Sequence, residues 1–355
     1  MQMKKFLIRT AVGLVIVIGA AFGGLAFSAW QSGLSIPAQF LRVVLLPAVP
    51  MPSASDPDKL RAMIQESRAT GPALPSAAFR AKFSVQESDV AGQQLWTAAP
   101  RESAGSPLRI LYIPGGAYIN QPLALHWDIA EQLIERTDAT LVMPFYPLAP
   151  ENDWQPAFEM VNTIYASLVE EVGAEHVVIM GDSSGGGIAL ALVQQIRDQN
   201  EPLPAAVVLF SPWLDVTLSD PDQVALDQRD FILSMDMLRI GGKWWAGDLP
   251  TTDPRISPLF GSLQGLPPIA VFTGTDDLLY PDATRLAENA KVANTCLSLF
   301  EYKNMFHVWV GVLPGIIPEA ARALDEAAAF VLDTPSACDE LTPASTNATA
   351  AAGPA

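Results

Sequence analysis

Between residues 107 and 332 the chain alternates short apolar runs with longer amphipathic stretches. Short apolar runs are typical of buried strands, and apolar residues that recur every three to four positions are typical of helices. The pattern predicts strands at 108–113, 140–143, 176–180, 205–210, 268–273 and 297–302, and helices at 123–136, 154–171, 184–198, 281–293 and 317–332. Because such alternation indicates a parallel sheet covered by helices on both faces, we expect an α/β fold.

The amino terminus has the pattern of a targeting segment. Three basic residues among the first nine precede an uncharged stretch whose most apolar part covers residues 11–27. We therefore expect residues 1–29 to be a signal peptide or a membrane anchor, with the body of the chain outside the cytoplasm, in the periplasm or the extracellular space. Ala26 and Ser28 provide small residues for a cleavage after Ser28, and the sequence leaves cleavage and retention both open.

Composition divides the remainder of the chain into three parts. Residues 30–106 are rich in Pro, Ser and small apolar residues and are expected to form a connector and an amino-terminal cap region. Residues 107–333 form the predicted main domain, which contains the alternating strands and helices. The stretch at about 213–258 is too long for a simple crossover and is expected to be a cap insertion over the carboxyl ends of the strands. Residues 334–355 contain almost no large apolar residue and are expected to be a disordered tail.

Charge and cysteine content exclude several classes of partner. The chain has 21 basic and 38 acidic residues, a formal net charge of −17. A chain this negative is repelled by phosphate, so we expect no nucleic-acid partner. Two cysteines, Cys296 and Cys338, are too few for a disulfide framework or a four-cysteine metal site. Two unrelated thiols are the simpler expectation, and one disulfide between them is the alternative.

A serine stands in a turn that is typical of a nucleophile. The apolar run at 176–180 leads directly into Gly-Asp-Ser-Ser-Gly at 181–185, and a predicted helix follows. Glycines two positions before and two after a serine allow the tight turn that exposes its hydroxyl at the end of a strand. Ser183 is therefore the candidate nucleophile. A phosphate-binding loop is the alternative, but the Gly-Lys-Ser/Thr sequence of such loops is missing here.

A serine hydroxyl needs a base, and the usual base is histidine. Of the three histidines, His176 begins the strand that leads to Ser183 and is expected at the opposite end of the sheet. His126 lies early in a predicted helix, before the nucleophile. His307 follows the last predicted strand, where a loop at the carboxyl end of the strand would present it. The position of His307 makes it the candidate base.

A carboxylate is expected in the loop after the preceding strand, which gives the order Ser, Asp, His. Asp276 and Asp277 both lie there, and the spacing alone does not choose between them. The first predicted strand ends just before Gly115 and Gly116. Their backbone N–H groups, together with that of Ser184, are the candidate donors to the oxyanion of a tetrahedral intermediate.

Taken together, these motifs resemble the hormone-sensitive-lipase-like branch of the α/β-hydrolase superfamily, which includes many bacterial esterases. The His-Gly-Gly-Gly/Ala motif of the family corresponds to Pro-Gly-Gly-Ala at 114–117, so that Pro114 replaces the histidine. Tyr-Arg-Leu-Ala-Pro-Glu corresponds to Tyr-Pro-Leu-Ala-Pro-Glu at 146–151, and Gly-Asp-Ser-Ala-Gly-Gly to Gly-Asp-Ser-Ser-Gly-Gly at 181–186. The family variant Gly-Thr-Arg-Asp aligns Asp277 with the acid. The resemblance implies a mostly parallel central sheet with helices on both faces and a helical cap.

The resemblance also implies an activity. It predicts a carboxylic ester hydrolase that forms an acyl-enzyme, acts on short or medium apolar acyl esters or lactones, and needs no metal or organic cofactor. Because the insertion is rich in Trp and Met, Tyr118 and Trp213 are candidate pocket walls. Amidase or deacetylase activity is one alternative. A non-catalytic protein that binds small molecules on the same fold is the other, and the oligomeric state is not predicted.

Overall fold

The computed structural model describes residues 21–48, 55–102 and 105–333. Most of the predicted targeting segment and the predicted disordered tail, 334–355, lie outside the described residues. Residues 21–32 are helical. Within the described ranges, no helix is long and apolar enough to cross a membrane.

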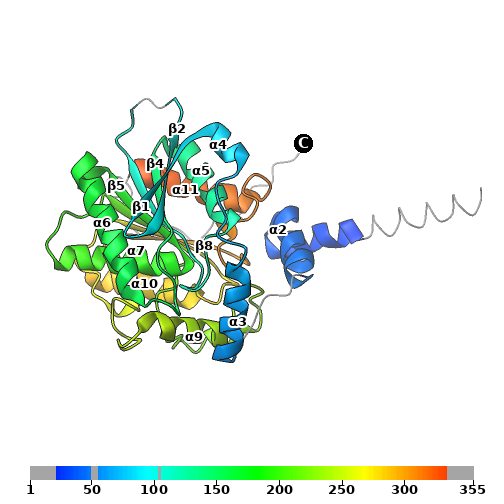
Figure 1. Ribbon diagram of the computed structural model, residues 1–355. Coiled ribbons are helices and arrows are strands. Elements are labelled where there is room, and N and C mark those ends of the chain that lie inside the picture. The colour runs from blue at the N-terminus through cyan, green and yellow to red at the C-terminus, as the bar shows by residue number, and fades with distance from the viewer. Residues whose placement is uncertain (1–20, 49–54, 103–104, 334–355) are drawn as a thin grey trace, which may run out of the picture.

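One eight-stranded sheet forms the centre of the molecule, in the order β1-β2-β4-β3-β5-β6-β7-β8 (Figure 1). Six strands run parallel, and each coincides with a predicted strand apart from small differences at its ends. In the four central strands almost all side chains are buried, as expected where helices cover both faces of a sheet. The six are β3 (Arg109–Ile113), β4 (Thr140–Pro144), β5 (Val177–Asp182), β6 (Ala206–Phe210), β7 (Ile269–Gly274) and β8 (Leu297–Tyr302).

An antiparallel hairpin, β1 (Phe83–Val90) and β2 (Gln93–Pro100), extends this sheet beyond β4. It lies within the stretch 30–106 that was expected to be a connector and cap region, so that assignment is corrected for these residues. The reason is that β1 is an edge strand whose middle residues are polar and mostly exposed. Such a strand lacks the apolar pattern by which buried strands are found, and its charges discourage pairing with other chains.

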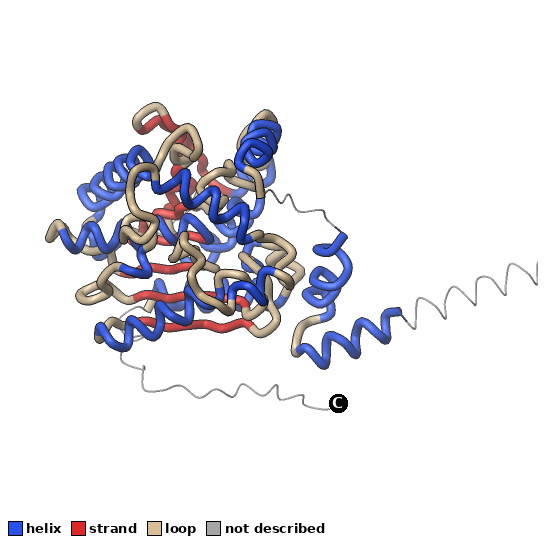
Figure 2. Tube along the Cα trace, turned by 90° about the horizontal axis from the view of Figure 1, so that it is seen from below, coloured by secondary structure: helices blue, strands red, loops and turns tan. Residues whose placement is uncertain are grey.

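Helices cover the sheet on both faces, as Figure 2 shows. One apolar core contains residues of α5 (Ala124–Thr137) and α11 (Pro318–Leu332). The core on the other face contains residues of α6 (Trp154–Val172), α7 (Ser183–Asp198) and α10 (Tyr280–Ala293). The predicted α/β architecture is confirmed.

Most of the remaining helices lie before the sheet or in the cap insertion, and short helices also precede β5 and follow β8. The guanidinium of Arg61 on α3 lies 4.7 Å from the ring of Trp244 on α9, so α3 contacts a helix of the insertion. The helices are α2 (Ile36–Phe40), α3 (Pro57–Arg68), α4 (Ala77–Lys82), α8 (Gln223–Asp227) and α9 (Met235–Ala246), with the short helices η1 (Leu41–Leu45), η2 (Leu46–Ala48), η3 (Ala174–His176), η4 (Pro258–Phe260) and η5 (Trp309–Gly311).

Cys296 directly precedes β8 and is disulfide-bonded. The simpler expectation of two unrelated thiols is therefore wrong for this residue. Cys338 lies outside the described residues.

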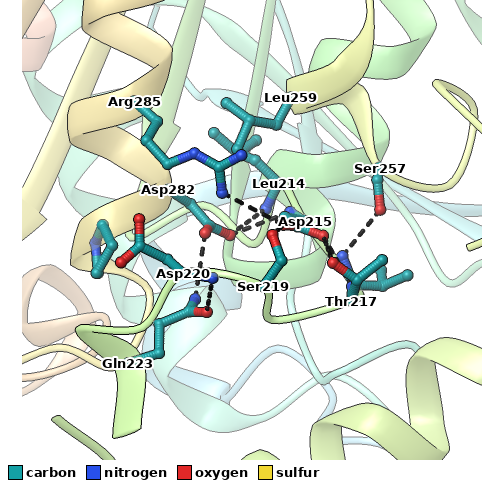
Figure 3. A network of polar contacts seen from close by, with 12 residues as sticks. Leu214, Asp215, Thr217, Ser219, Asp220, Gln223, Ser257, Leu259, Asp282 and Arg285 are labelled. Atoms are coloured by element: carbon teal, nitrogen blue, oxygen red, sulfur yellow. Dashed lines mark hydrogen bonds and ion pairs between the residues drawn. The ribbon is translucent and has the colours of Figure 1, made fainter. Parts of the chain in front are cut away.

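A buried polar network links the base of the cap insertion to α10 (Figure 3). The carboxylate of Asp282 accepts hydrogen bonds from the backbone N–H groups of Leu214 (3.2 Å) and Asp215 (3.0 Å) and from Nε2 of Gln223 (3.2 Å). Asp215 in turn lies 3.3 Å from Nη1 of Arg285. Burial, and then the charge of Asp215, raise the pKa of Asp282 well above its usual value. Asp282 therefore holds the start of the insertion through hydrogen bonds within the protein interior.

Replacing Asp282 by alanine is expected to lower the free energy of unfolding by about 2–4 kcal/mol, because three buried donors lose their acceptor. Asp282→Asn keeps a carbonyl oxygen for the two backbone N–H groups and should lose clearly less. Urea unfolding of the two variants and the parent protein measures the difference. Equal losses in both variants would contradict a role for Asp282 as the shared acceptor.

Candidate active site

Three of the predicted site residues meet at the carboxyl ends of β5, β7 and β8. Nε2 of His307 lies 2.9 Å from Oγ of Ser183. Nδ1 of His307 lies 3.1 and 3.0 Å from the two carboxylate oxygens of Asp277. All three side chains are buried or nearly so. The structure therefore places a hydroxyl, an imidazole and a carboxylate in one chain of hydrogen bonds.

The turn between β5 and α7 holds Ser183 in an unusual backbone conformation. Its φ angle is +51°, in the left-handed region that non-glycine residues rarely adopt. A Cβ at Gly185 would lie 2.0 Å from the carbonyl oxygen of Ile113, so α7 can approach β3 this closely only with glycine there. The N–H of Trp213 donates to the carbonyl oxygen of Ser183 (2.8 Å). These contacts keep the hydroxyl at the end of the strand, as the sequence predicted.

The loops that carry the carboxylate and the imidazole are bonded to each other. The N–H of Asp276 donates to the carbonyl oxygen of Met305 (3.0 Å), and the N–H of Asn304 donates to Oγ1 of Thr275 (2.8 Å). These bonds connect the loop after β7 with the loop after β8. The separation of the two functional groups is therefore fixed by backbone contacts and not by their side chains alone.

The two adjacent aspartates have different partners. Asp277 contacts His307, and its Oδ1 also accepts from the N–H of Leu279 (2.9 Å). Asp276 instead forms an ion pair with Arg42, whose Nε lies 3.0 Å from Oδ2. The spacing left both aspartates open as the acid. The geometry favours Asp277, because of the two only Asp277 contacts the imidazole.

The expected oxyanion donors differ in whether their N–H groups already have an acceptor. The N–H of Gly115 donates to Oδ1 of Asp182 (3.0 Å), so this group is engaged, which corrects its assignment as an oxyanion donor. Within the described part of the chain, the N–H groups of Gly116 and Ala117 have no bonded acceptor. Ser184 lies in the first turn of α7, whose N–H groups have no acceptor within the helix. Gly116, Ala117 and Ser184 therefore hold the available donors.

The residue between Gly181 and Ser183 has a role that the sequence analysis did not identify. Besides the Gly115 N–H, Oδ1 of Asp182 accepts from the hydroxyl of Tyr112 (2.6 Å), and its Oδ2 lies 3.5 Å from Nε2 of His126. Burial alone would raise the pKa of Asp182, but His126, Tyr112 and the Gly115 N–H together hold it below its usual value. This ionised carboxylate connects the nucleophile turn to the loop after β3.

Further hydrogen bonds hold the loop after β3, one of them at position 114, where the family motif has histidine. The hydroxyl of Tyr146 donates to the carbonyl oxygen of Pro114 (3.0 Å), and the N–H of Tyr118 donates to Oγ of Ser184 (3.2 Å). The loop is therefore held at both ends without a histidine at position 114.

Tyr118 and Trp213, the candidate pocket walls, are packed in the interior. The ring of Tyr118 stacks between those of Trp213 and Trp245, with centroid distances of 5.1 and 4.3 Å. All three side chains are buried. Rings that are this completely covered do not line an open cavity, so the expectation is corrected. They fill the space between the cap insertion and the nucleophile turn.

Asp230, in the cap insertion, was also not identified from the sequence. Its Oδ2 accepts from the N–H of Leu278 (2.8 Å), next to Asp277, and its Oδ1 accepts from the N–H groups of Ile232 (2.7 Å) and Leu233 (2.9 Å). Burial, and then the charge of Asp277, raise the pKa of Asp230 to about 6. Asp230 therefore joins the cap to the loop that carries Asp277.

The surrounding carboxylates change the basicity of His307. Burial alone would lower its pKa, but the charge and hydrogen bond of Asp277, followed by the charges of Asp230 and Asp182, outweigh burial. The net effect is a pKa of His307 above its usual value of about 6.5. The same charges stabilise an imidazolium, should one form during a reaction.

Comparisons with known proteins agree with the fold. A family model described as the α/β hydrolase fold matches residues 110–311. An esterase of Acinetobacter venetianus is 31% identical over 282 residues, covering 77% of this chain and 88% of the relative. An acetyl-hydrolase of Streptomyces hygroscopicus is 34% identical over 227 residues, covering 62% and 74%. The crystal structure of a hormone-sensitive lipase from a metagenome library superposes with a TM-score of 0.69 at 27% identity, covering 83% and 95%.

These matches define a class of enzyme, the serine hydrolases that act on ester bonds. The chain belongs to the α/β-hydrolase family, in the hormone-sensitive-lipase-like branch of esterases and lipases. The part of the chain that the structure describes holds no cluster of three or more side chains that could bind a metal ion.

The pH dependence of turnover is expected to reflect the raised pKa of His307. Since the imidazole must be neutral to accept a proton, kcat/KM should fall as the pH is lowered, with a midpoint above about 6.5. Asp230→Asn removes a negative charge that raises this pKa, so the midpoint should move to lower pH. The measurement is kcat/KM of a soluble p-nitrophenyl ester between pH 5 and 9.

Asp227→Asn is the matched control for this experiment. Asp227 lies in the same insertion, but its Oδ1 accepts only from the N–H of Met235 (2.8 Å). Its midpoint should equal that of the parent protein. An unchanged midpoint in Asp230→Asn would show that Asp230 does not act on the imidazole.

Proposed function

We propose that the chain hydrolyses carboxylic esters through an acyl-enzyme on Ser183. The observation that carries the proposal is the continuous chain of hydrogen bonds from Ser183 through His307 to Asp277. His307 Nε2 would accept the hydroxyl proton as Oγ attacks the carbonyl carbon of the ester. Asp277 would hold the Nδ1–H tautomer and stabilise the imidazolium that forms.

The remaining steps use the free backbone donors and the same imidazole. The N–H groups of Gly116, Ala117 and Ser184 would bind the oxyanion, where the charge develops. The imidazolium of His307 would donate its proton to the leaving alcohol. The neutral imidazole that results would take a proton from the water that attacks the acyl-enzyme. It would return this proton to Oγ of Ser183 as the bond between Oγ and the acyl group breaks and the carboxylic acid leaves.

The favoured substrates are esters or lactones with short or medium apolar acyl groups. The relative from Streptomyces hygroscopicus is named an acetyl-hydrolase, which agrees with a short acyl group. Deacetylation and amide hydrolysis use the same groups and are decided by the substrate panel below.

A fluorophosphonate probe and a substrate panel test the function together. The purified protein should be labelled at Ser183 and should hydrolyse p-nitrophenyl acetate and butyrate, whereas Ser183→Ala should do neither. The panel adds a lactone, an anilide and an acetylated sugar to compare the other scissile bonds. A protein that is neither labelled nor active on any member would instead be a non-catalytic binding protein on this fold.

The two adjacent aspartates provide a paired test of the acid. Asp277→Asn should lower kcat by about 10³–10⁴-fold, because the amide favours the wrong imidazole tautomer. Asp276→Asn should leave kcat within about tenfold of the parent, since Asp276 contacts Arg42 and not the imidazole. Steady-state kinetics of both variants measures the contrast, and a reversed order would assign the acid to Asp276.

We also propose that the protein is exported and keeps its amino-terminal segment as a membrane attachment. The surroundings of the predicted cleavage point after Ser28 support this proposal. The point lies inside a helix, and Ser28 forms hydrogen bonds with residues farther along the chain. Oγ of Ser28 accepts from Nε2 of Gln39 (2.7 Å), Oγ of Ser32 donates to the carbonyl oxygen of Ser28 (3.0 Å), and Ala29 is buried. The intact mass of the protein isolated from membranes checks the proposal, and a mass that lacks residues 1–28 would contradict it.

A further inference from the structure

The helices of residues 21–45 lie against the part of the body that carries the acid and the imidazole. Figures 1 and 2 both show them at one side of the body, and in Figure 1 they lie on the side of the orange segment near the carboxyl end. Arg42 pairs with Asp276, and Nδ2 of Asn304 donates to the carbonyl oxygen of Ser32 (2.7 Å). Both loops of the site therefore contact this segment.

A third contact and an apolar core complete the attachment. The N–H and Oγ of Ser35 donate to the carboxylate of Glu319 (2.6 and 2.8 Å) in the first turn of α11. Leu34, Ala38 and Leu41 are buried in the same core as residues on either side of His307. The inner face of the segment is thus part of the folded body.

The outer face of the segment is apolar and exposed. The side chains of Phe22, Phe27 and Trp30 are 58%, 57% and 76% exposed. The other residues of this short helix are almost all apolar or small. Of the sixteen large apolar side chains that are exposed among the described residues, seven lie on residues 21–45: Phe22, Phe27, Trp30, Phe40, Val43, Val44 and Leu45. Leu313 and Ile316, just before the turn that holds Glu319, are exposed as well. Such a concentration marks an interaction surface.

The charge distribution indicates what this surface contacts. Residues 1–55 contain four of the chain's 21 basic residues and none of its 38 acidic residues. The only one of the four within the described residues, Arg42, is paired with Asp276 and is not available to a lipid phosphate. Directly before the exposed helix, residues 11–20 are uncharged and mostly apolar. The exposed helix therefore continues an apolar stretch of the sequence, and both favour an apolar environment.

We propose that residues 21–45, together with Leu313 and Ile316, form a membrane-docking surface that lies in the interfacial layer of a lipid bilayer. Exposed aromatic and aliphatic side chains on helices at the surface of a protein are suited to this layer. Because the contacts of the segment are apolar, docking requires no anionic lipid and resists salt. The two loops of the active site are consequently held at the membrane surface.

A consequence, which rests on the proposed ester hydrolysis, concerns the substrate. An enzyme whose site loops are held at the bilayer meets esters that partition into lipid at a higher local concentration than esters in solution. The docking surface therefore favours interfacial esters without any change in the catalytic groups.

Site-specific fluorescence tests the docking surface in the full chain. A polarity-sensitive nitrobenzoxadiazole label is attached in turn to Trp30→Cys, Val44→Cys and Ile316→Cys, and the proteins are reconstituted into phosphatidylcholine vesicles. Cys296 is disulfide-bonded and does not compete for the label. At all three positions emission should shift to shorter wavelength and be quenched by nitroxide lipid, at both 0.1 and 0.5 M salt.

Val292→Cys is the matched control, because Val292 is apolar and 91% exposed but lies at the end of α10 away from the site loops. Its emission should not change. A shift at position 30 alone would mean that the body is only tethered, and would overturn the proposal. A shift that appears without vesicles and accompanies a doubled mass would assign the surface to a second copy of the chain, and would also overturn it.

Substituting the surface gives a second readout that separates docking from catalysis. The combined variant Val43→Ser, Val44→Ser and Ile316→Ser should hydrolyse soluble p-nitrophenyl acetate as fast as the parent, but a vesicle-embedded p-nitrophenyl ester several-fold more slowly. Val292→Ser should change neither rate. Equal rates of the combined variant and the parent on the embedded ester would contradict docking, whereas absence of turnover on both esters in the parent would contradict the proposed function alone.

Discussion

The arrangement of the site depends on one close backbone approach, that of α7 to the end of β3. Only a residue without a Cβ fits at Gly185, where the carbonyl oxygen of Ile113 lies in the way of any side chain. This approach places the free N–H groups at the start of α7 beside the loop after β3. It also directs Asp182 toward Gly115, so that the same turn presents Ser183 on one side and supports the oxyanion loop on the other.

Buried carboxylates are the second organising element. Asp182, Asp230, Asp277 and Asp282 all lie in the interior or at its edge, and each accepts backbone N–H groups that compensate for lost water. Three of them surround His307 and make it a stronger base than burial alone would allow. One of these charges, that of Asp230, belongs to the cap insertion. The insertion therefore influences the pKa of His307 as well as covering the site.

Most of the parallel sheet could be predicted, because strands buried on both faces are continuous apolar runs. The hairpin of β1 and β2 could not, since an exposed edge strand has no such run. Ser183 and His307 could be chosen from chain order and from the scarcity of histidine. Asp230 could not, because it lies 47 positions before Asp277 in a stretch without a regular pattern.

The oxyanion loop shows a different limit of sequence reasoning. Which N–H groups are free depends on the backbone angles of Gly116 and Ala117, whose φ values are +139° and +56°. Sequence identifies the glycines but not the direction of each N–H. In the same way, aromatic residues near a motif predict a pocket or a core equally well, and only the packing of Tyr118 between two tryptophans decides for the core.

The contacts of Ser32, Ser35 and Arg42 make the first described helices a part of the tertiary structure. A shortened protein that began at residue 110, where the family-matched region starts, would lack the donors to Asp276 and Glu319 and would uncover apolar core beside His307. The tertiary contacts of the body therefore extend beyond the region that the family model matches, on its amino-terminal side.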